Sequence, residues 1–196
     1  REMHARCIAE AFPEELLNMI ESANPSGIMA PLHVDEHFFG LDDCDVLEVG
    51  DYSLRMVLVP GHTPGNSIFW MKEQKTMFTG DHVLFGITTN ITFWTNVEDS
   101  LGDYMDSLRR AREFPVERAL PAHRKTGDYH RRIDELLEHC NRRTAEALEV
   151  IRSMPGLSAY EISAHMTWKI RAGNWETFPA IQKWFALGEC VSHLDY

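Results

Sequence analysis

The sequence predicts an α/β fold in which a strand-rich part, residues 1–127, is followed by a small all-helical part, residues 128–196. Short apolar runs of strand length fill the middle of the chain, helical patterns flank them, and strand signals end after residue 127. Of 196 residues, 44% are apolar and 25% are charged, which is the composition of a globular protein large enough to bury a core. This composition excludes disorder, collagen and low-complexity repeats.

In the first part, a helical pattern runs from Met3 to Ser22, with Pro13 at the first turn of a second helix, Glu14–Glu21. Asp99 or Ser100 caps a later helix that stops at Pro115. Four apolar runs predict strands, and a polar four-residue connection of hairpin length joins the second to the third. The runs are Leu54–Val59, Ser67–Met71, Thr76–Thr79 and Val116–Leu120.

In the second part, we expect a long helix from Asp128 that ends before Pro155-Gly156, a short helix with a capping box at Ser158, and a third helix over Phe178–Leu194. Tryptophan and phenylalanine side chains of this part are expected to form a small core. The buried face of the long helix is predicted from apolar positions alone. These positions are Ile133, Leu136, Leu137, Cys140, Leu148 and Ile151.

Charge and cysteine usage narrow the functional class. Acidic residues outnumber basic ones by 30 to 19, for a net charge of −11, and no sustained basic stripe is present, so nucleic-acid binding is disfavoured. The four cysteines lie far apart, as is typical of reduced thiols in a cytosolic protein. No apolar run approaches the roughly 18 residues of a membrane span, and no signal peptide is recognised. We therefore expect a cytoplasmic protein with no membrane contact.

The chemistry is expected where strands end. Val59 leads into a turn rich in Gly and Pro that carries His62, and the hairpin that follows should return Asp81 to its side. His123 follows another short strand. Two imidazoles and a carboxylate at strand ends are suitable ligands for a divalent metal. Isolated histidines after strands are also common as packed or surface residues, so spacing alone does not decide.

The segments Pro60-Gly61-His62-Thr63-Pro64-Gly65, Phe78-Thr79-Gly80-Asp81 and Leu120-Pro121-Ala122-His123 resemble the second half of a metallo-β-lactamase-fold hydrolase. The resemblance implies a partial αββα sandwich. It also implies a centre with two metal ions, zinc or else iron or manganese, in which His62 binds the first ion, Asp81 bridges both and His123 binds the second. The helical part resembles the winged-helix-like C-terminal domain of a hydrolase subgroup that includes RNA-cleaving members.

Two departures from the family pattern stand out. Arg124 follows His123 where the family has glycine, and the upstream His-x-His-x-Asp-His motif is absent, since none of the ten histidines are two residues apart. His33 and His37 offer only an imitation with the wrong spacing. We therefore expect residues 1–196 alone to bind metal weakly, to be inactive and to expose apolar surface. A complementing N-terminal segment or a homodimer is the expected remedy.

The resemblance implies metal-assisted hydrolysis of an ester, a thioester or a related acyl bond of a small molecule. His82 is a candidate second catalytic residue beside Asp81, and Phe85 and Trp94 are candidates for contact with substrate, with core packing as the alternative for all three. Two other functions stay open: a metal-dependent ribonuclease of the same fold, and a non-catalytic scaffold or dimerisation module.

Overall fold

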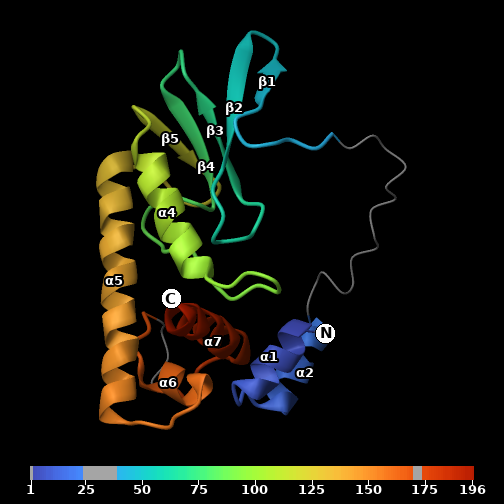
Figure 1. Ribbon diagram of the computed structural model, residues 1–196, viewed down its shortest axis with the longest axis vertical. Coiled ribbons are helices and arrows are strands. Elements are labelled where there is room, and N and C mark those ends of the chain that lie inside the picture. The colour runs from blue at the N-terminus through green and yellow to red at the C-terminus, as the bar shows by residue number, and fades with distance from the viewer. Residues whose placement is uncertain (1, 24–38, 170–173) are drawn as a thin grey trace.

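The computed structural model describes residues 2–23, 39–169 and 174–196 of the chain (Figure 1). His33 and His37 lie outside these residues. A sheet occupies one end of the molecule, several short helices occupy the other, and one long helix runs past both. The mixed α/β class predicted from the sequence is confirmed.

Five strands form the sheet in the order β1-β2-β3-β4-β5. They are β1 (Val46–Val49), β2 (Tyr52–Leu58), β3 (Ser67–Met71), β4 (Thr76–Gly80) and β5 (Arg118–Pro121). The first four are antiparallel neighbours, and β5 lies parallel to β4. The strands expected at Ser67–Met71 and Thr76–Thr79 are confirmed, whereas β1 has no counterpart among the predicted strands.

One face of the sheet is covered by helix α4 (Ser100–Arg112), whose N-terminus is capped by the side chain of Asp99, one of the two caps that the sequence predicts. The N-terminal half of α5 (Tyr129–Ser153), the upper half in Figure 1, packs against α4 in the same core. Inward-facing strand residues alternate with outward-facing ones, so Ile68, Trp70 and Met77 meet the helices in a first hydrophobic cluster. Burial of this one face holds the sheet and α4 together.

The opposite face of the sheet is also apolar. Phe69 pairs with Phe78 across β3 and β4, and Phe78 pairs with Leu120 across β4 and β5. The Phe78 side chain is 39% exposed, and Phe69 and Leu120 are half-buried. The sequence predicts exposed apolar surface, and the face of the sheet that α4 does not cover is one place where apolar side chains are partly exposed.

A second cluster lies at the helical end, where α7 (Ala180–Asp195) packs against α6 (Ala159–His165), the lower part of α5 and α2 (Glu14–Ala23). Cys7 of α1 (Glu2–Ala9) belongs to the same cluster. The capping box at Ser158 is present. The described residues after 127 form helices without a strand, and the winged-helix resemblance and the domain division at residue 127 both stay predictions.

The predicted buried face of α5 is wrong at its lower end. Leu148 and Ile151 are 41% and 36% exposed, whereas Arg143, Ala147 and Val150 are buried. The buried stripe continues from Cys140 at intervals of three and four residues, and it passes through an arginine. A prediction from apolar positions alone leaves Arg143 out of the buried stripe, and it therefore places the neighbouring face, with Leu148 and Ile151, in the core.

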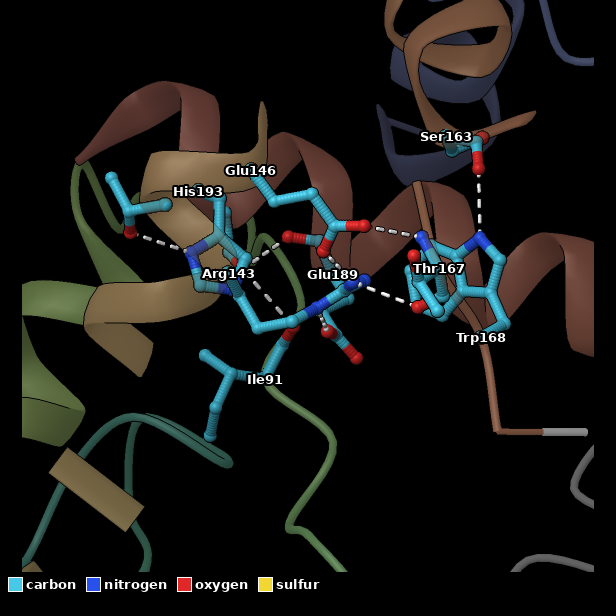
Figure 2. Close-up of polar contacts among 10 residues, drawn as sticks. Ile91, Arg143, Glu146, Ser163, Thr167, Trp168, Glu189 and His193 are labelled. Atoms are coloured by element: carbon cyan, nitrogen blue, oxygen red, sulfur yellow. Dashed lines mark hydrogen bonds and ion pairs between the residues drawn. The ribbon is translucent and has the colours of Figure 1, made fainter. Parts of the chain in front are cut away.

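Arg143 is the centre of a buried polar network between α5 and α7 (Figure 2). Its Nε donates to Glu189 at 2.9 Å, its Nη1 donates to Glu146 and to the Thr167 carbonyl, and the guanidinium lies 4.3 Å from the Trp168 ring centroid. Burial raises the pKa of Glu189, and the charge of Arg143 opposes that rise. These contacts satisfy most of a charge that would otherwise be costly to bury.

Among the helices that the structure describes, none is both long enough and apolar enough to cross a bilayer. All four cysteines are free, as expected, and Cys44 alone among them is exposed.

Candidate active site

Three strands bring their carboxyl ends to one edge of the sheet. Because β2 is antiparallel to β3, and β3 to β4, strands β2 and β4 run in the same direction, and β5 runs parallel to β4. The loop with His62 follows β2, Asp81 follows β4, and His123 follows β5. The topology therefore explains why residues far apart in sequence meet at this edge.

The turn before His62 is shaped by close contact with α4. Gly61 has φ +132°, and a Cβ atom there would lie 2.4 Å from Cβ of Tyr104. Only glycine fits this position without displacing α4. Ser107 of the same helix donates from its hydroxyl to the Pro60 carbonyl at 2.9 Å, which fixes the start of the turn.

His62 presents one ring nitrogen to the site. Its Nδ1 lies 2.8 Å from the carbonyl oxygen of Asn90. A carbonyl can only accept, so Nδ1 carries the proton and Nε2 keeps the free lone pair of the neutral ring. Trp94 donates from Nε1 to the His62 carbonyl at 3.1 Å and holds the backbone as well. This is the arrangement in which metal-binding histidines are usually held.

Asp81 lies between the two histidines. Its Oδ2 is 4.0 Å from Nε2 of His62, and its Oδ1 is 3.2 Å from Nε2 of His123. Oδ1 is buried and has no hydrogen-bond partner within the part of the chain that the structure describes. Thr89 donates to the Asp81 carbonyl at 2.6 Å. A buried, unsatisfied carboxylate oxygen is costly, and a cation would satisfy it.

His123 is the most exposed of the three, at 62% of its side-chain surface. The backbone on its N-terminal side is tied to β4, since the Ala122 amide donates to the Gly80 carbonyl at 3.0 Å. On its C-terminal side, Arg124 has φ +68°, in the left-handed region that favours glycine. The position after His123, where the family pattern has glycine, thus has a backbone conformation that favours glycine in this chain as well.

These residues fit a metal ion by donor type and by the orphaned oxygen of Asp81. They do not complete a site, because residues 2–23, 39–169 and 174–196 contain no group of three or more His, Cys, Asp or Glu residues arranged to hold an ion. His62, Asp81 and His123 are brought together as a partial ligand set. Their role as ligands stays a prediction.

His82 lies beneath this edge rather than at its surface. The side chain is fully buried against the Tyr104 ring, with 5.3 Å between centroids, and neither ring nitrogen has a hydrogen-bond partner among the described residues. Burial lowers the pKa of His82 to about 3, so the ring is neutral. This is a packing position, and a catalytic role for His82 stays untested.

The two candidates for contact with substrate are placed differently. Phe85 belongs to the first hydrophobic cluster and is 6% exposed, which matches the core-packing alternative. Trp94 is half-buried beside His62 and also lines an open groove with α1. Sequence reasoning missed Thr89 and Asn90, which hold Asp81 and His62. Asn90 acts through its backbone carbonyl, for which no side-chain signal exists.

Comparison with known proteins agrees with this geometry. A sequence model of the metallo-beta-lactamase superfamily matches residues 8–123. The chain is 28% identical over 141 residues to the beta-lactamase-like protein 2 homolog of Caenorhabditis elegans, covering 69% of this chain and 45% of that protein. It is 34% identical over 83 residues to an atrochrysone carboxyl ACP thioesterase of Emericella nidulans, covering 42% of this chain and 25% of that protein.

Two solved structures are similar as well. A beta-lactamase domain protein from Burkholderia ambifaria gives a TM-score of 0.71 at 26% identity over 83% of this chain and 47% of its own. A metallo-beta-lactamase family protein from Thermus thermophilus gives 0.67 at 26% identity over 82% of this chain and 49% of its own. The chain spans about half the length of these two proteins and of the Caenorhabditis elegans relative.

The relatives include lactamase-like proteins and a protein named as a thioesterase, which support a hydrolase-type function. The sheet with its converging strand ends matches the solved neighbours in fold. The superfamily model covers residues 8–123, more than half of the sequence, and this chain therefore belongs to the metallo-beta-lactamase superfamily.

Proposed function

We propose that this chain supplies part of the active site of a metal-dependent hydrolase that cleaves acyl bonds, with thioesters and esters as its substrate class. The observation that carries the proposal is the buried Oδ1 of Asp81, which has no hydrogen-bond partner in the described chain and lies 3.2 Å from His123. A bound cation would satisfy an oxygen in that state. The similarity to a thioesterase-named protein favours acyl substrates.

His62, Asp81 and His123 would hold the metal. A bound divalent cation, zinc or else iron or manganese, supplies Lewis-acid stabilisation of developing negative charge and lowers the pKa of bound water. The chain's own part is positional. The Asn90 carbonyl keeps Nε2 of His62 facing the site, and the Asp81 carboxylate supplies the negative charge between the two imidazoles.

Two imidazoles and one carboxylate are too few for a tight site with two ions, since each ion needs about three or four protein ligands. We propose that further ligands come from a complementing N-terminal segment or from a second copy of the chain. The acidic net charge of −11 favours a small-molecule substrate over RNA, because nucleic-acid affinity depends on neutralising phosphates.

The test uses the intact protein, stripped with a chelator and reloaded separately with zinc, manganese and iron(II). Thiol release from acyl thioesters and acid release from esters are measured. Asp81→Asn should reduce the metal-restored rate by more than about a hundredfold, because it removes a ligand itself rather than a group that orients one. Asp106→Asn is the matched control, since Asp106 lies exposed on α4 and pairs only with Arg109 among the described residues.

Hydrolysis that is restored by metal and lost in Asp81→Asn supports the proposal. Absence of acyl hydrolysis with every metal, or full activity of Asp81→Asn, overturns it. Metal-dependent cleavage of single-stranded RNA in place of acyl hydrolysis also overturns it and favours the ribonuclease alternative.

A further inference from the structure

We infer that helix α7 positions the proposed metal centre, with Ser192 and Gly188 fixing the loop that sets the orientation of His62. This inference rests on the proposed function and adds two positioning residues to it. The loop concerned is residues 82–94, which follows Asp81 and is called the site loop below. It lies between the ligand-bearing edge of the sheet and the helical end of the molecule.

On one side, the site loop holds two of the candidate ligands. The Asn90 carbonyl accepts from Nδ1 of His62 at 2.8 Å, and Trp94 donates to the His62 carbonyl at 3.1 Å. Thr89 donates to the Asp81 carbonyl at 2.6 Å. The direction in which His62 presents Nε2 therefore depends on where the peptide of Asn90 lies.

On the other side, α7 holds the same loop at the next residue. Ser192 is 1% exposed, and its single hydroxyl proton is shared between two acceptors, the Ile91 carbonyl at 3.1 Å and the Glu189 carbonyl of its own helix at 2.8 Å. Ile91 lies beside the polar network of α5 and α7 (Figure 2). The carbonyls of Asn90 and Ile91 are consecutive along the backbone. One is bound by the candidate ligand and the other by α7.

Gly188 provides the close approach that this contact requires. A Cβ atom at Gly188 would lie 2.3 Å from Oγ1 and 3.1 Å from Cβ of Thr92. Phe93, the next residue of the loop, is buried in the second cluster with Leu187 and Val191 of α7. Three consecutive residues of the loop, 91 to 93, are thus fixed by one helix, through a hydrogen bond, a backbone approach and a buried ring. Such packing holds a ligand within a narrow range of orientations.

The first test compares Ser192→Ala with Ser163→Ala. Ser163 is also a fully buried serine of the helical end, and its hydroxyl bonds within α6 to the Tyr160 carbonyl, away from the site loop. Three quantities are measured on the intact protein. They are amide exchange over residues 89–94, the ¹⁵N signals of the His62 ring that report which nitrogen is protonated at alkaline pH, and the dissociation constant for zinc.

In Ser192→Ala we expect amide exchange at 89–94 to rise about fivefold, as the loss of one neutral hydrogen bond predicts. The His62 ring signals should move toward a mixture of the two tautomers. The zinc dissociation constant should rise about threefold to tenfold, at or below the lower end of the range seen when a direct partner of a metal-binding histidine is removed. Ser163→Ala should leave all three unchanged.

The second test uses Gly188→Ala, which should weaken zinc binding more than Ser192→Ala does. Adding Thr92→Ala removes the 2.3 Å contact and leaves the 3.1 Å contact, which still requires a small shift, so the double variant should recover part of the loss. Recovery identifies the local contact, rather than a weakened helix, as the cause.

The inference is overturned if Ser192→Ala and Ser163→Ala behave alike in amide exchange and in the His62 ring signals. If the unaltered protein binds none of zinc, manganese and iron(II), the proposed function fails. The exchange and ring signals are measured without metal, so they still decide whether α7 orients His62.

Discussion

The Nε2 atom of His123 lies 3.2 Å from Oδ1 of Asp81, and the two residues follow neighbouring parallel strands joined through helix α4. The contact falls within ion-pair distance, yet Oδ1 has no hydrogen-bond partner in the described parts of the chain. Asp81 thus has a carboxylate oxygen without a partner among those residues, at the position where the proposed metal centre needs a ligand.

Residues 1–196 by themselves should bind zinc weakly, since His62, Asp81 and His123 provide too few ligands for a tight site. Equilibrium dialysis on this chain measures the affinity. His123→Ala should weaken it further, whereas His165→Ala, an exposed histidine on α6, should leave it unchanged. Tight, near-stoichiometric zinc in the unaltered chain would contradict this prediction.

Arg124→Gly should stabilise the fold by about 1 kcal/mol, because Arg124 has φ +68°, a conformation that costs a side-chain-bearing residue about 1–2 kcal/mol and glycine little. Part of the gain is offset by the greater freedom of glycine in the unfolded chain. Denaturant unfolding measures the difference. Arg124→Ala removes the charge and keeps the strained backbone, so it should bring no gain. Equal stabilisation by both variants would assign the effect to charge instead.

Arg143→Ala should destabilise the protein by about 3–5 kcal/mol, because it leaves Glu189 buried without its cationic partner. The neighbouring Arg142→Ala should change stability by less than about 0.5 kcal/mol, since Arg142 is exposed and pairs with Glu138 on the helix surface. Both values come from denaturant unfolding.

Replacing both buried charges, as Arg143→Met with Glu189→Gln, should recover much of the loss of Arg143→Ala. A double variant that is no more stable than Arg143→Ala would show that packing of the guanidinium on Trp168, rather than the unpaired carboxylate, dominates the cost.

Stability should decrease as the pH falls below about 6.5, with His193 contributing to the slope. Burial lowers the pKa of His193 from 6.5 to about 3, so between these values the unfolded chain binds a proton that the folded chain does not. The free energy of unfolding therefore decreases toward acid, by up to about 1.4 kcal/mol per pH unit for one group, and is unaffected by this group above 6.5.

His193→Asn should flatten the acid side of the stability profile, at the cost of the contact between Nδ1 and the Thr144 hydroxyl. The measurement is denaturant unfolding at a series of pH values between about 4 and 8. An unchanged slope in His193→Asn would mean that other groups, His82 among them, account for the acid sensitivity.

Much of the fold could be predicted because local signals and final structure agree. The sequence predicts the strand at Ser67–Met71, a helix cap at Asp99 or Ser100 and the capping box at Ser158, and the structure has the strand, the capping box and Asp99 as the cap. β1 escaped notice because most of its residues are exposed at the edge of the sheet, so it lacks a buried face that would give an alternating pattern. The lower face of α5 was misread because a buried ion pair interrupts its apolar stripe.

The candidate site could be predicted only as far as side chains reveal it. Gly61 and the hairpin return of Asp81 are visible as sequence motifs, and the structure places His62 and Asp81 side by side. Asn90 accepts from His62 through its backbone carbonyl, and the Ile91 carbonyl accepts from Ser192, on a helix about 100 residues later in the chain. Such contacts depend on tertiary packing, and no local sequence pattern predicts them.

Helix α5 contributes Ile133 and Leu136 to the first cluster and Ala147 and Val150 to the second. Truncation after residue 127 would therefore remove core side chains that pack against α4, and it would leave a cavity in the first cluster. Both clusters include residues of this one helix, so heating should unfold them in a single step. A shortened protein that keeps the sheet would need to include at least the first half of α5.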